Sequence, residues 1–172
     1  MKIVIAGPFD AGKTTFIKSI SEITVLSTER QVSDPSGRAG SETTVAMDFG
    51  RVTISDDIVL YLFGTPGQER FSFMWDTLSE GMLGFIVLID GSSNASVTEA
   101  QSMLEYFGQM AEVNYVVAAN RVSPDDTEKL DRLRADLSLD EAVPLLATDA
   151  RDRASVKAVI LALLNDILAN LG

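Results

Sequence analysis

Eight residues near the amino terminus have the spacing of a phosphate-binding loop. Gly7 to Thr14 read GPFDAGKT, which fits the pattern G-x-x-x-x-G-K-[ST]. The glycines let successive backbone N–H groups point inward at anionic oxygens, and the helix that follows adds its positive end. We expect Lys13 to reach the β- and γ-phosphates of a nucleotide and the Thr14 hydroxyl to ligate Mg²⁺. A glycine-containing turn with an unrelated lysine is the alternative.

The segments around this loop supply the context that the motif requires. KIVIA, at residues 2–6, reads as a buried strand, and KTTFIKSISEI, at 13–23, reads as an amphipathic helix. Further strands are predicted over 44–54, 57–63, 83–90, 114–120 and 142–149, and further helices within 64–81 and over 96–110, 125–137 and 154–168. The polar segment 27–44 is predicted to be a long loop. This alternation indicates an α/β fold of the P-loop NTPase type, with a mostly parallel six-stranded sheet, one antiparallel hairpin and helices on both faces.

Length and composition narrow the function classes. The 172 residues are expected to form a single domain, 1–172. The chain has no cysteine and no histidine, so thiol catalysis and the commonest general base are excluded. A net charge of −11 argues against binding nucleic acid or anionic lipid. No apolar run is long enough to span a membrane and the first strand leaves no room for a signal peptide, so we expect a cytoplasmic protein without a direct membrane anchor.

The order of the motifs resembles the Ras-like small GTPases over nearly the whole chain. TTVAMDFG followed by LYLFGTPGQERF is most similar, within that family, to the bacterial motility-polarity and actinobacterial conservon GTPases. The resemblance implies binding of GTP or GDP with Mg²⁺, slow hydrolysis of GTP to GDP and phosphate, and two switch segments that reorder with the nucleotide state.

The resemblance assigns roles within the two switch segments. Thr44 matches the threonine that binds Mg²⁺ and the γ-phosphate, although Thr43 stands beside it and a threonine is also favoured at a strand start. Gly67 suits a backbone contact to the γ-phosphate, and Gln68 suits orienting the attacking water. Gly64 stands where the family usually has an aspartate that holds a magnesium-bound water, so one metal contact is expected to be weaker.

A substitute carboxylate and a catalytic arginine are both left open by the sequence. Asp90 ends an apolar strand, as in ATPases, but we prefer the interpretation that it caps the turn at Gly91. Phe9 occupies the loop position through which a partner's arginine usually enters, so an arginine of this chain is expected to act. Arg38 is the first candidate and Arg70 the second, and each is alternatively a solvated charge.

The base-binding motifs are partly kept. NRVS stands where the family has N-K-x-D, so Asn120 can brace the phosphate loop and contact the base, and the stem of Arg121 can lie over the purine. Ser123 cannot supply the carboxylate that pairs with guanine N1 and N2. In TDARDRASV, the Ala150 N–H is placed for guanine O6, and Asp149 either replaces the missing carboxylate or caps the last helix. The expected nucleotide contacts are Gly7, Asp10, Ala11, Gly12, Lys13, Thr14, Thr15, Thr44, Gly67, Asn120, Arg121, Asp149, Ala150 and Arg151, with Thr14 and Thr44 also holding the metal.

Aromatic residues just past the γ-phosphate sensor suggest an effector contact. Phe71, Phe73 and Trp75 lie close together, and a moving switch could present them to a partner. Permanent packing on the neighbouring helix is the alternative. The family resemblance also implies a roadblock-type regulator.

The sequence therefore predicts a GTP-binding molecular switch that hydrolyses GTP slowly. A P-loop ATPase or kinase is the first alternative, favoured by Ser123 and Asp90. A pseudo-GTPase that binds nucleotide without turning it over is the second, favoured by Gly64.

Overall fold

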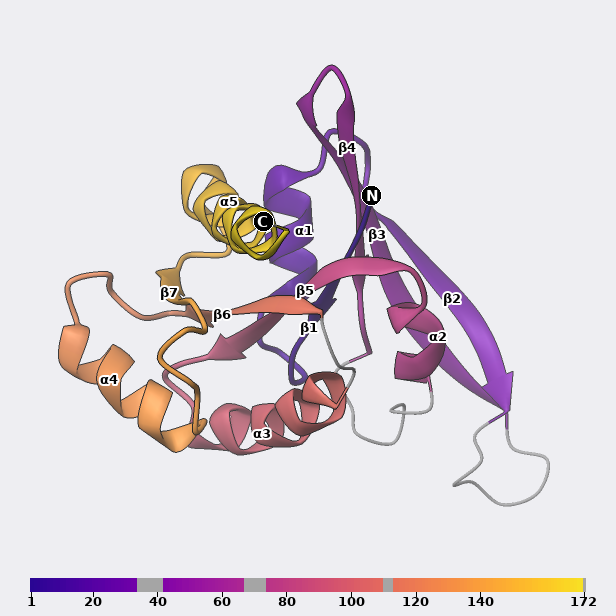
Figure 1. Ribbon diagram of the computed structural model, residues 1–172. Helices are drawn as coiled ribbons and strands as arrows, with labels where there is room; N and C mark the ends of the chain where they lie inside the picture. Colours follow the sequence, from indigo (N-terminus) through magenta and orange to yellow (C-terminus); the bar gives the residue numbers. More distant parts are fainter. Residues whose placement is uncertain (34–41, 67–73, 110–112, 172) are drawn as a thin grey trace.

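A computed structural model describes residues 1–33, 42–66, 74–109 and 113–171 (Figure 1). Its centre is a seven-stranded sheet in the order β2-β3-β4-β1-β5-β6-β7. The strands are β1 (Lys2–Ala6), β2 (Leu26–Ser33), β3 (Glu42–Ser55), β4 (Ile58–Gly64), β5 (Met82–Asp90), β6 (Asn114–Asn120) and β7 (Leu145–Thr148). The helices are α1 (Lys13–Ile20), α2 (Trp75–Ser79), α3 (Asn94–Gly108), α4 (Thr127–Asp136) and α5 (Arg153–Asn170). The predicted α/β fold of the P-loop NTPase type is confirmed.

The sheet is parallel from β4 through β1, β5, β6 and β7, and antiparallel from β2 through β3 to β4. The parallel strands are joined through helices, whereas β3 and β4 form the predicted hairpin. Parallel strands end at the same edge of a sheet, so the loops after β1, β5, β6 and β7 come together there, next to the end of β4. These are the loops that carry the predicted phosphate and base motifs.

The six predicted strands are all present, and β2 adds a seventh at the edge. The prediction of a loop over 27–44 is therefore wrong for its two ends, because β2 pairs antiparallel with the first half of β3 from Leu26 opposite Phe49 to Ser33 opposite Glu42. β3 is 14 residues long and β4 only 7. The part of β3 that extends beyond β4 is paired by β2 along the opposite edge of β3.

Two apolar layers fix the sheet between its helices. Figure 1 shows α1 and α5 on one side of the sheet and α3 on the other. Ile3 and Ile5 of β1 belong to the core under α1 and α5, whereas Val4 and Ala6 belong to the core under α3. This alternation follows from the two-residue period of a strand, and burial on both faces explains why β1 and β5 are continuously apolar.

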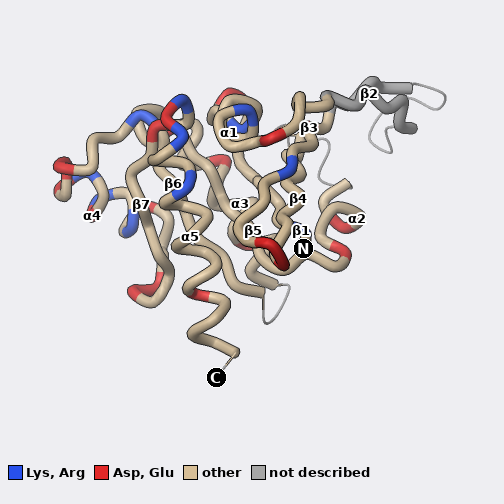
Figure 2. Tube along the Cα trace, turned by 90° about the horizontal axis from the view of Figure 1, so that it is seen from above, with Lys and Arg blue, Asp and Glu red and all other residues tan. Residues whose placement is uncertain are grey.

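Three helices begin at recognisable capping residues. Ser93, Asp126 and Asp152 cap α3, α4 and α5 by accepting a hydrogen bond from a backbone N–H three residues later. Acidic and basic positions are interspersed along α4, whereas α5 is nearly free of charge in its middle (Figure 2). Within the described ranges, no helix is both long and apolar enough to cross a membrane.

Candidate functional site

The loop between β1 and α1 has the backbone geometry that the motif predicts. Gly12 has φ 103° and Asp10 has φ 62°, both in the left-handed region. A Cβ at Gly7 would lie 2.1 Å from the Leu88 carbonyl oxygen, and one at Gly12 would lie 2.5 Å from Asn120 Nδ2. Both positions therefore require glycine, because the backbone of the loop runs directly against β5 and β6.

Lys13 is held inside this loop. Its Nζ donates to the carbonyl oxygens of Gly7 at 2.6 Å and Pro8 at 2.7 Å, and the residue is buried. Burial lowers the pKa of Lys13 to about 8, against the opposing effect of nearby carboxylates, chiefly Asp48. The ammonium is thus still largely charged at neutral pH, and a set of anionic oxygens would stabilise it further.

A carboxylate that sequence reasoning missed lies beside Thr14. Asp48 Oδ2 accepts a hydrogen bond from Thr14 Oγ1. Asp48 is in β3, directly opposite Gly64 of β4 in the antiparallel register. A Cβ at Gly64 would lie 3.3 Å from Asp48 Cβ and 3.1 Å from Ile17 Cδ1. The neighbouring strand β3 therefore places the Asp48 carboxylate next to Gly64, the position at which Ras-like GTPases usually have an aspartate. The only sequence signal was the aspartate of TVAMDF, whose partner across the hairpin is not readable from the motif.

Asn120 joins the phosphate loop to the loop after β7. It is buried; its Nδ2 donates to the Ala11 carbonyl oxygen at 3.0 Å, and its Oδ1 accepts from the N–H groups of Ala150 and Arg121, both at 3.1 Å. The bracing contact predicted for Asn120 is present. The Ala150 N–H, predicted to face guanine O6, donates to Asn120 in this structure.

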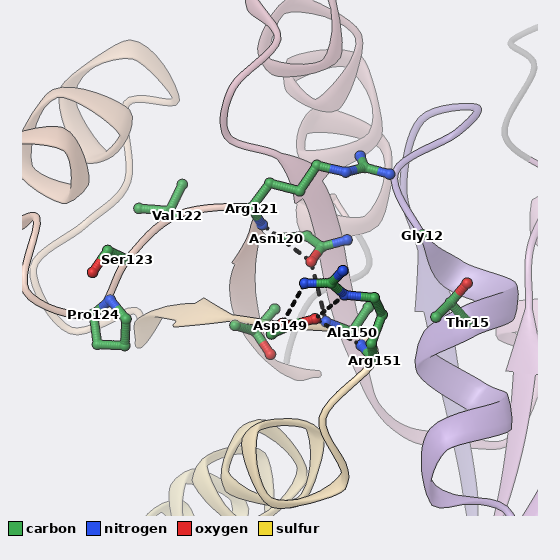
Figure 3. A pocket seen from close by; sticks show the side chains of 11 residues that line it. Gly12, Thr15, Asn120, Arg121, Val122, Ser123, Pro124, Asp149, Ala150 and Arg151 are labelled. Atoms are coloured by element: carbon green, nitrogen blue, oxygen red, sulfur yellow. Dashed lines mark hydrogen bonds and ion pairs between the residues drawn. The ribbon is translucent and has the colours of Figure 1, made fainter.

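A cavity of about 610 Å³ opens beside this junction (Figure 3). It lies at the edge of the sheet where the base motifs were predicted to meet. The exposed Ser123 is at its rim, and the Ser123 Oγ accepts from the Asp125 N–H at 3.4 Å. The lining residues are Gly12, Thr15, Asn120, Arg121, Val122, Ser123, Pro124, Thr148, Asp149, Ala150 and Arg151. Its size and position suit a nucleobase next to the phosphate loop.

Asp149 is held by Arg151 on one side of this cavity. Its Oδ1 accepts from the backbone N–H and Nε of Arg151 at 2.9 and 3.0 Å, and its Oδ2 accepts from Nη2 at 2.9 Å. These hydrogen bonds lower the pKa of the Asp149 carboxyl to about 2. The alternative that Asp149 caps the last helix is wrong, because Asp152 does so. The carboxylate keeps further lone pairs for a base, which it would share with Arg151.

Asp90 is bound to its own turn and to Arg121. Its Oδ1 accepts from the Ser92 N–H at 2.9 Å and the Ser92 hydroxyl at 2.6 Å, and its Oδ2 forms an ion pair with Arg121 Nη1 at 2.7 Å. The prediction that Asp90 stabilises the turn at Gly91 is confirmed. The carboxylate that accepts a hydrogen bond from the Thr14 hydroxyl is that of Asp48 and not that of Asp90.

Several predicted site residues lie outside what the structure describes. These are Arg38, Gly67, Gln68, Arg70, Phe71 and Phe73, and their roles stay predictions. Thr44 and Thr43 belong to β3, opposite Gln31 and Val32, and their side chains are also outside the described set.

Trp75 is buried, and its ring stacks on Phe107 and meets Tyr106 edge-on. In this conformation Trp75 therefore follows the packing alternative. An effector contact through it would require α2 to move.

Residues 37–170 match the model of a family described as "Conserved hypothetical ATP binding protein". The chain belongs to this family. The match to this family begins after the phosphate loop, so it does not depend on the motif at Gly7–Thr14.

Similar proteins include the Ras-related protein Rab-8B of Homo sapiens, which is 24% identical over 176 residues that cover 99% of this chain and 79% of that protein. Rab-8A of Rattus norvegicus has the same identity and coverage. An uncharacterized protein of Methanocaldococcus jannaschii is 27% identical over 129 residues, 74% of each chain. These findings support a Ras-like P-loop protein and not the narrower resemblance to the bacterial motility-polarity and conservon groups.

Proposed function

We propose that this protein is a nucleotide-dependent switch that binds GTP or GDP with Mg²⁺ and hydrolyses GTP slowly. The observation that carries the proposal is the Thr14–Asp48 contact beside the buried Lys13, inside a glycine-bounded loop at a helix start. This arrangement offers inward backbone N–H groups and one cation to phosphates, and hard oxygen ligands to a divalent ion. The Ras-related relatives support GTP as the nucleotide.

The residues present fit a magnesium ion. The Thr14 hydroxyl and the Asp48 carboxylate already meet, and both are oxygen donors of the kind that Mg²⁺ prefers, directly or through water. Thr44 is proposed as a third contact. When bound, Mg²⁺ would offset negative charge on the β- and γ-phosphate oxygens.

Hydrolysis is proposed to follow in-line attack of water on the γ-phosphorus, with breakage of its bond to the β–γ bridging oxygen. Lys13 holds the phosphate chain, Gly67 contacts the γ-phosphate through its backbone, and Gln68 orients the water. Arg38 is proposed to stabilise the charge that develops on the leaving oxygen. GDP and phosphate are the products.

ATP is the second candidate nucleotide. The family description names ATP binding, and the exposed Ser123 leaves the base cavity without the usual guanine-reading carboxylate. Two other functions are compatible with the same phosphate loop. An ATPase would differ from the first proposal in the base that it binds, and a pseudo-GTPase would differ in not hydrolysing the nucleotide.

The nucleotide that co-purifies with the protein separates these candidates. Denatured protein would be analysed for bound nucleotide by ion-exchange chromatography, and the nucleotide-free protein would then be mixed with GTP or ATP labelled at the γ-phosphate. We expect GDP in the extract and slow release of phosphate from GTP. Adenine nucleotide and phosphate release from ATP would favour the ATPase, and bound nucleotide without phosphate release would favour the pseudo-GTPase.

Partners and location complete the proposal. A roadblock-type regulator is proposed to bind the triphosphate state through Phe71, Phe73 and Trp75, with Trp75 leaving its packed position on α3. The cytoplasmic location expected from the sequence belongs to the same proposal.

A further inference from the structure

Two residues with left-handed backbone meet at the edge of the nucleotide site. Asp10 has φ 62° and Arg121 has φ 63°. Residues with a Cβ adopt this conformation when surrounding contacts hold them there. Arg121 Nη1 donates to the Asp10 carbonyl oxygen at 3.2 Å, so the two residues are among those contacts. Figure 3 shows the Arg121 side chain reaching from the end of β6 toward the loop at Gly12.

The same nitrogen of Arg121 is also held by Asp90. The distance from Nη1 to Asp90 Oδ2 is 2.7 Å, and the side chains are 45% and 18% exposed. The two hydrogen bonds from Ser92 fix Oδ1, which leaves Oδ2 pointing at the guanidinium. Burial opposes ionisation of Asp90, but the hydrogen bonds from Ser92 together with the charge and hydrogen bond of Arg121 outweigh it and keep the pKa of the carboxyl below its usual value.

The backbone under this ion pair is closely packed. The Gly91 N–H donates to the Asn120 carbonyl oxygen at 3.0 Å, and a Cβ at Gly91 would lie 2.3 Å from Val122 Cγ2. The ends of β5 and β6 are thus held together by backbone contacts that do not depend on the Asp90–Arg121 ion pair. An exposed ion pair on such a rigid base contributes little to folding stability.

We propose that Asp90 is a positioning residue for the nucleotide: it holds Arg121 between the phosphate loop and the base cavity, so that both are arranged before the nucleotide binds. Arg121 lines the cavity with its stem and bonds the phosphate loop with its head. Without Asp90, the guanidinium keeps, among its contacts to described residues, the longer one to Asp10. The long side chain then regains rotamers that nucleotide binding would have to restrict. This inference rests on the proposed nucleotide binding.

The test uses the whole chain and fluorescent analogues of GDP and ATP, whose dissociation is followed after mixing with excess unlabelled nucleotide. Asp90→Asn keeps the size of the side chain and an acceptor for Ser92 but removes the charge that faces Arg121. Arg121→Ala removes the other partner, and the double variant completes the cycle. Glu128→Gln is the matched control, because it removes a carboxylate from the Arg132–Glu128 ion pair on α4.

We expect Asp90→Asn to speed dissociation of the tighter-bound analogue by about fivefold, since part of a charged contact is lost. In the Arg121→Ala background the same change should alter the rate less than about twofold, because the partner is already absent. Thermal unfolding of the nucleotide-free Asp90→Asn variant should match that of Glu128→Gln.

An unchanged dissociation rate in Asp90→Asn would overturn the inference. So would an equal rate increase from Asp90→Asn in the wild type and in Arg121→Ala, because Asp90 would then act through its own turn and not through Arg121. If Asp90→Asn does not fold, Arg121→Gln removes the same ion pair by changing its more exposed partner. An unchanged dissociation rate in Arg121→Gln would then overturn the inference. Failure of the wild-type protein to bind either analogue would instead remove the proposed function, and this inference with it.

Discussion

Asp48 and Gly64 face each other across the antiparallel pair of β3 and β4, and the carboxylate of Asp48 accepts a hydrogen bond from the Thr14 hydroxyl. A glycine at 64 leaves room for this side chain, because any Cβ there would press on Asp48 and Ile17. A carboxylate is therefore present beside the phosphate loop, but it is that of Asp48 in β3 and not one at position 64 of β4.

Replacing Asp48 by asparagine should weaken magnesium-dependent nucleotide binding. Loss of a charged oxygen ligand removes roughly 1.5–3 kcal/mol, which corresponds to about a ten- to hundredfold lower affinity. Titration of a fluorescent GDP analogue with and without Mg²⁺ measures this. Asp57→Asn, in the turn between β3 and β4, is the matched control and should keep wild-type affinity. Equal affinities for both variants would show that Asp48 has no part in the metal site.

Exchanging the two residues should restore part of that loss. Asp48→Gly alone removes the acid, and the added change Gly64→Asp returns it from β4, with the space that Asp48 had occupied now open. We expect the double variant to recover at least about a third of the lost binding free energy, since packing against Ile17 still costs roughly 1 kcal/mol. Magnesium-dependent affinity no better than that of Asp48→Gly would contradict this.

Nucleotide binding should take up a proton above pH 8. The Lys13 ammonium has its pKa lowered from 10.5 to about 8 by burial, and phosphate charges would raise it again. Calorimetry at pH 8.5–9 in buffers of different ionisation enthalpy counts the protons, and we expect close to one at the upper end of this range. Lys13→Ala should lose both the proton uptake and most of the affinity. Wild-type binding without proton uptake would mean that Lys13 does not meet the phosphates.

The same pKa sets the sign of a stability effect. Between pH 8 and 10.5 the unfolded chain holds the Lys13 proton more firmly than the folded nucleotide-free protein does, so this residue makes folding more favourable as pH rises through that window. Denaturant unfolding at pH 8 and pH 10 should show a smaller gain in Lys13→Met than in the wild type.

Asp149 is predicted to read guanine despite its pairing with Arg151. Guanine offers donors at N1 and N2, whereas adenine has an acceptor at N1, so the carboxylate favours GTP. Asp149→Ala should lower GTP affinity by about ten- to hundredfold and leave ATP binding little changed, as expected for one hydrogen bond to a charged group. Ser123→Asp in that background should recover much of the loss. A full GTP preference in Asp149→Ala would show that Asp149 does not select the base.

Gln68→Leu should slow hydrolysis of GTP by at least about tenfold without altering affinity, because its proposed role is on the attacking water and not on the bound nucleotide. A single-turnover assay separates the two quantities. An unaltered rate would remove Gln68 from the mechanism.

The phosphate loop and the elements around it could be predicted from the amino-acid sequence. Both signals are local: the glycine and lysine spacing lies within eight residues, and each strand or helix shows its period over a short window. The predicted strands and helices are present where the apolar residues of the period are also the buried ones. The edge strand β2 was not predicted, because its residues are largely polar and its pairing with the first half of β3 is a tertiary contact that no local period shows.

Which acidic residues lie beside the candidate site could be read only from the folded chain. Asp48 reaches Thr14 across 34 residues and Arg121 reaches Asp90 across 31, and both contacts depend on strand register and strand order, which no local pattern encodes. Asp149 and Arg151 are close in the chain, but their pairing depends on the turn that begins α5. Residue types could therefore predict that a phosphate would be bound, whereas the source of the carboxylate beside it followed from how β3 and β4 align.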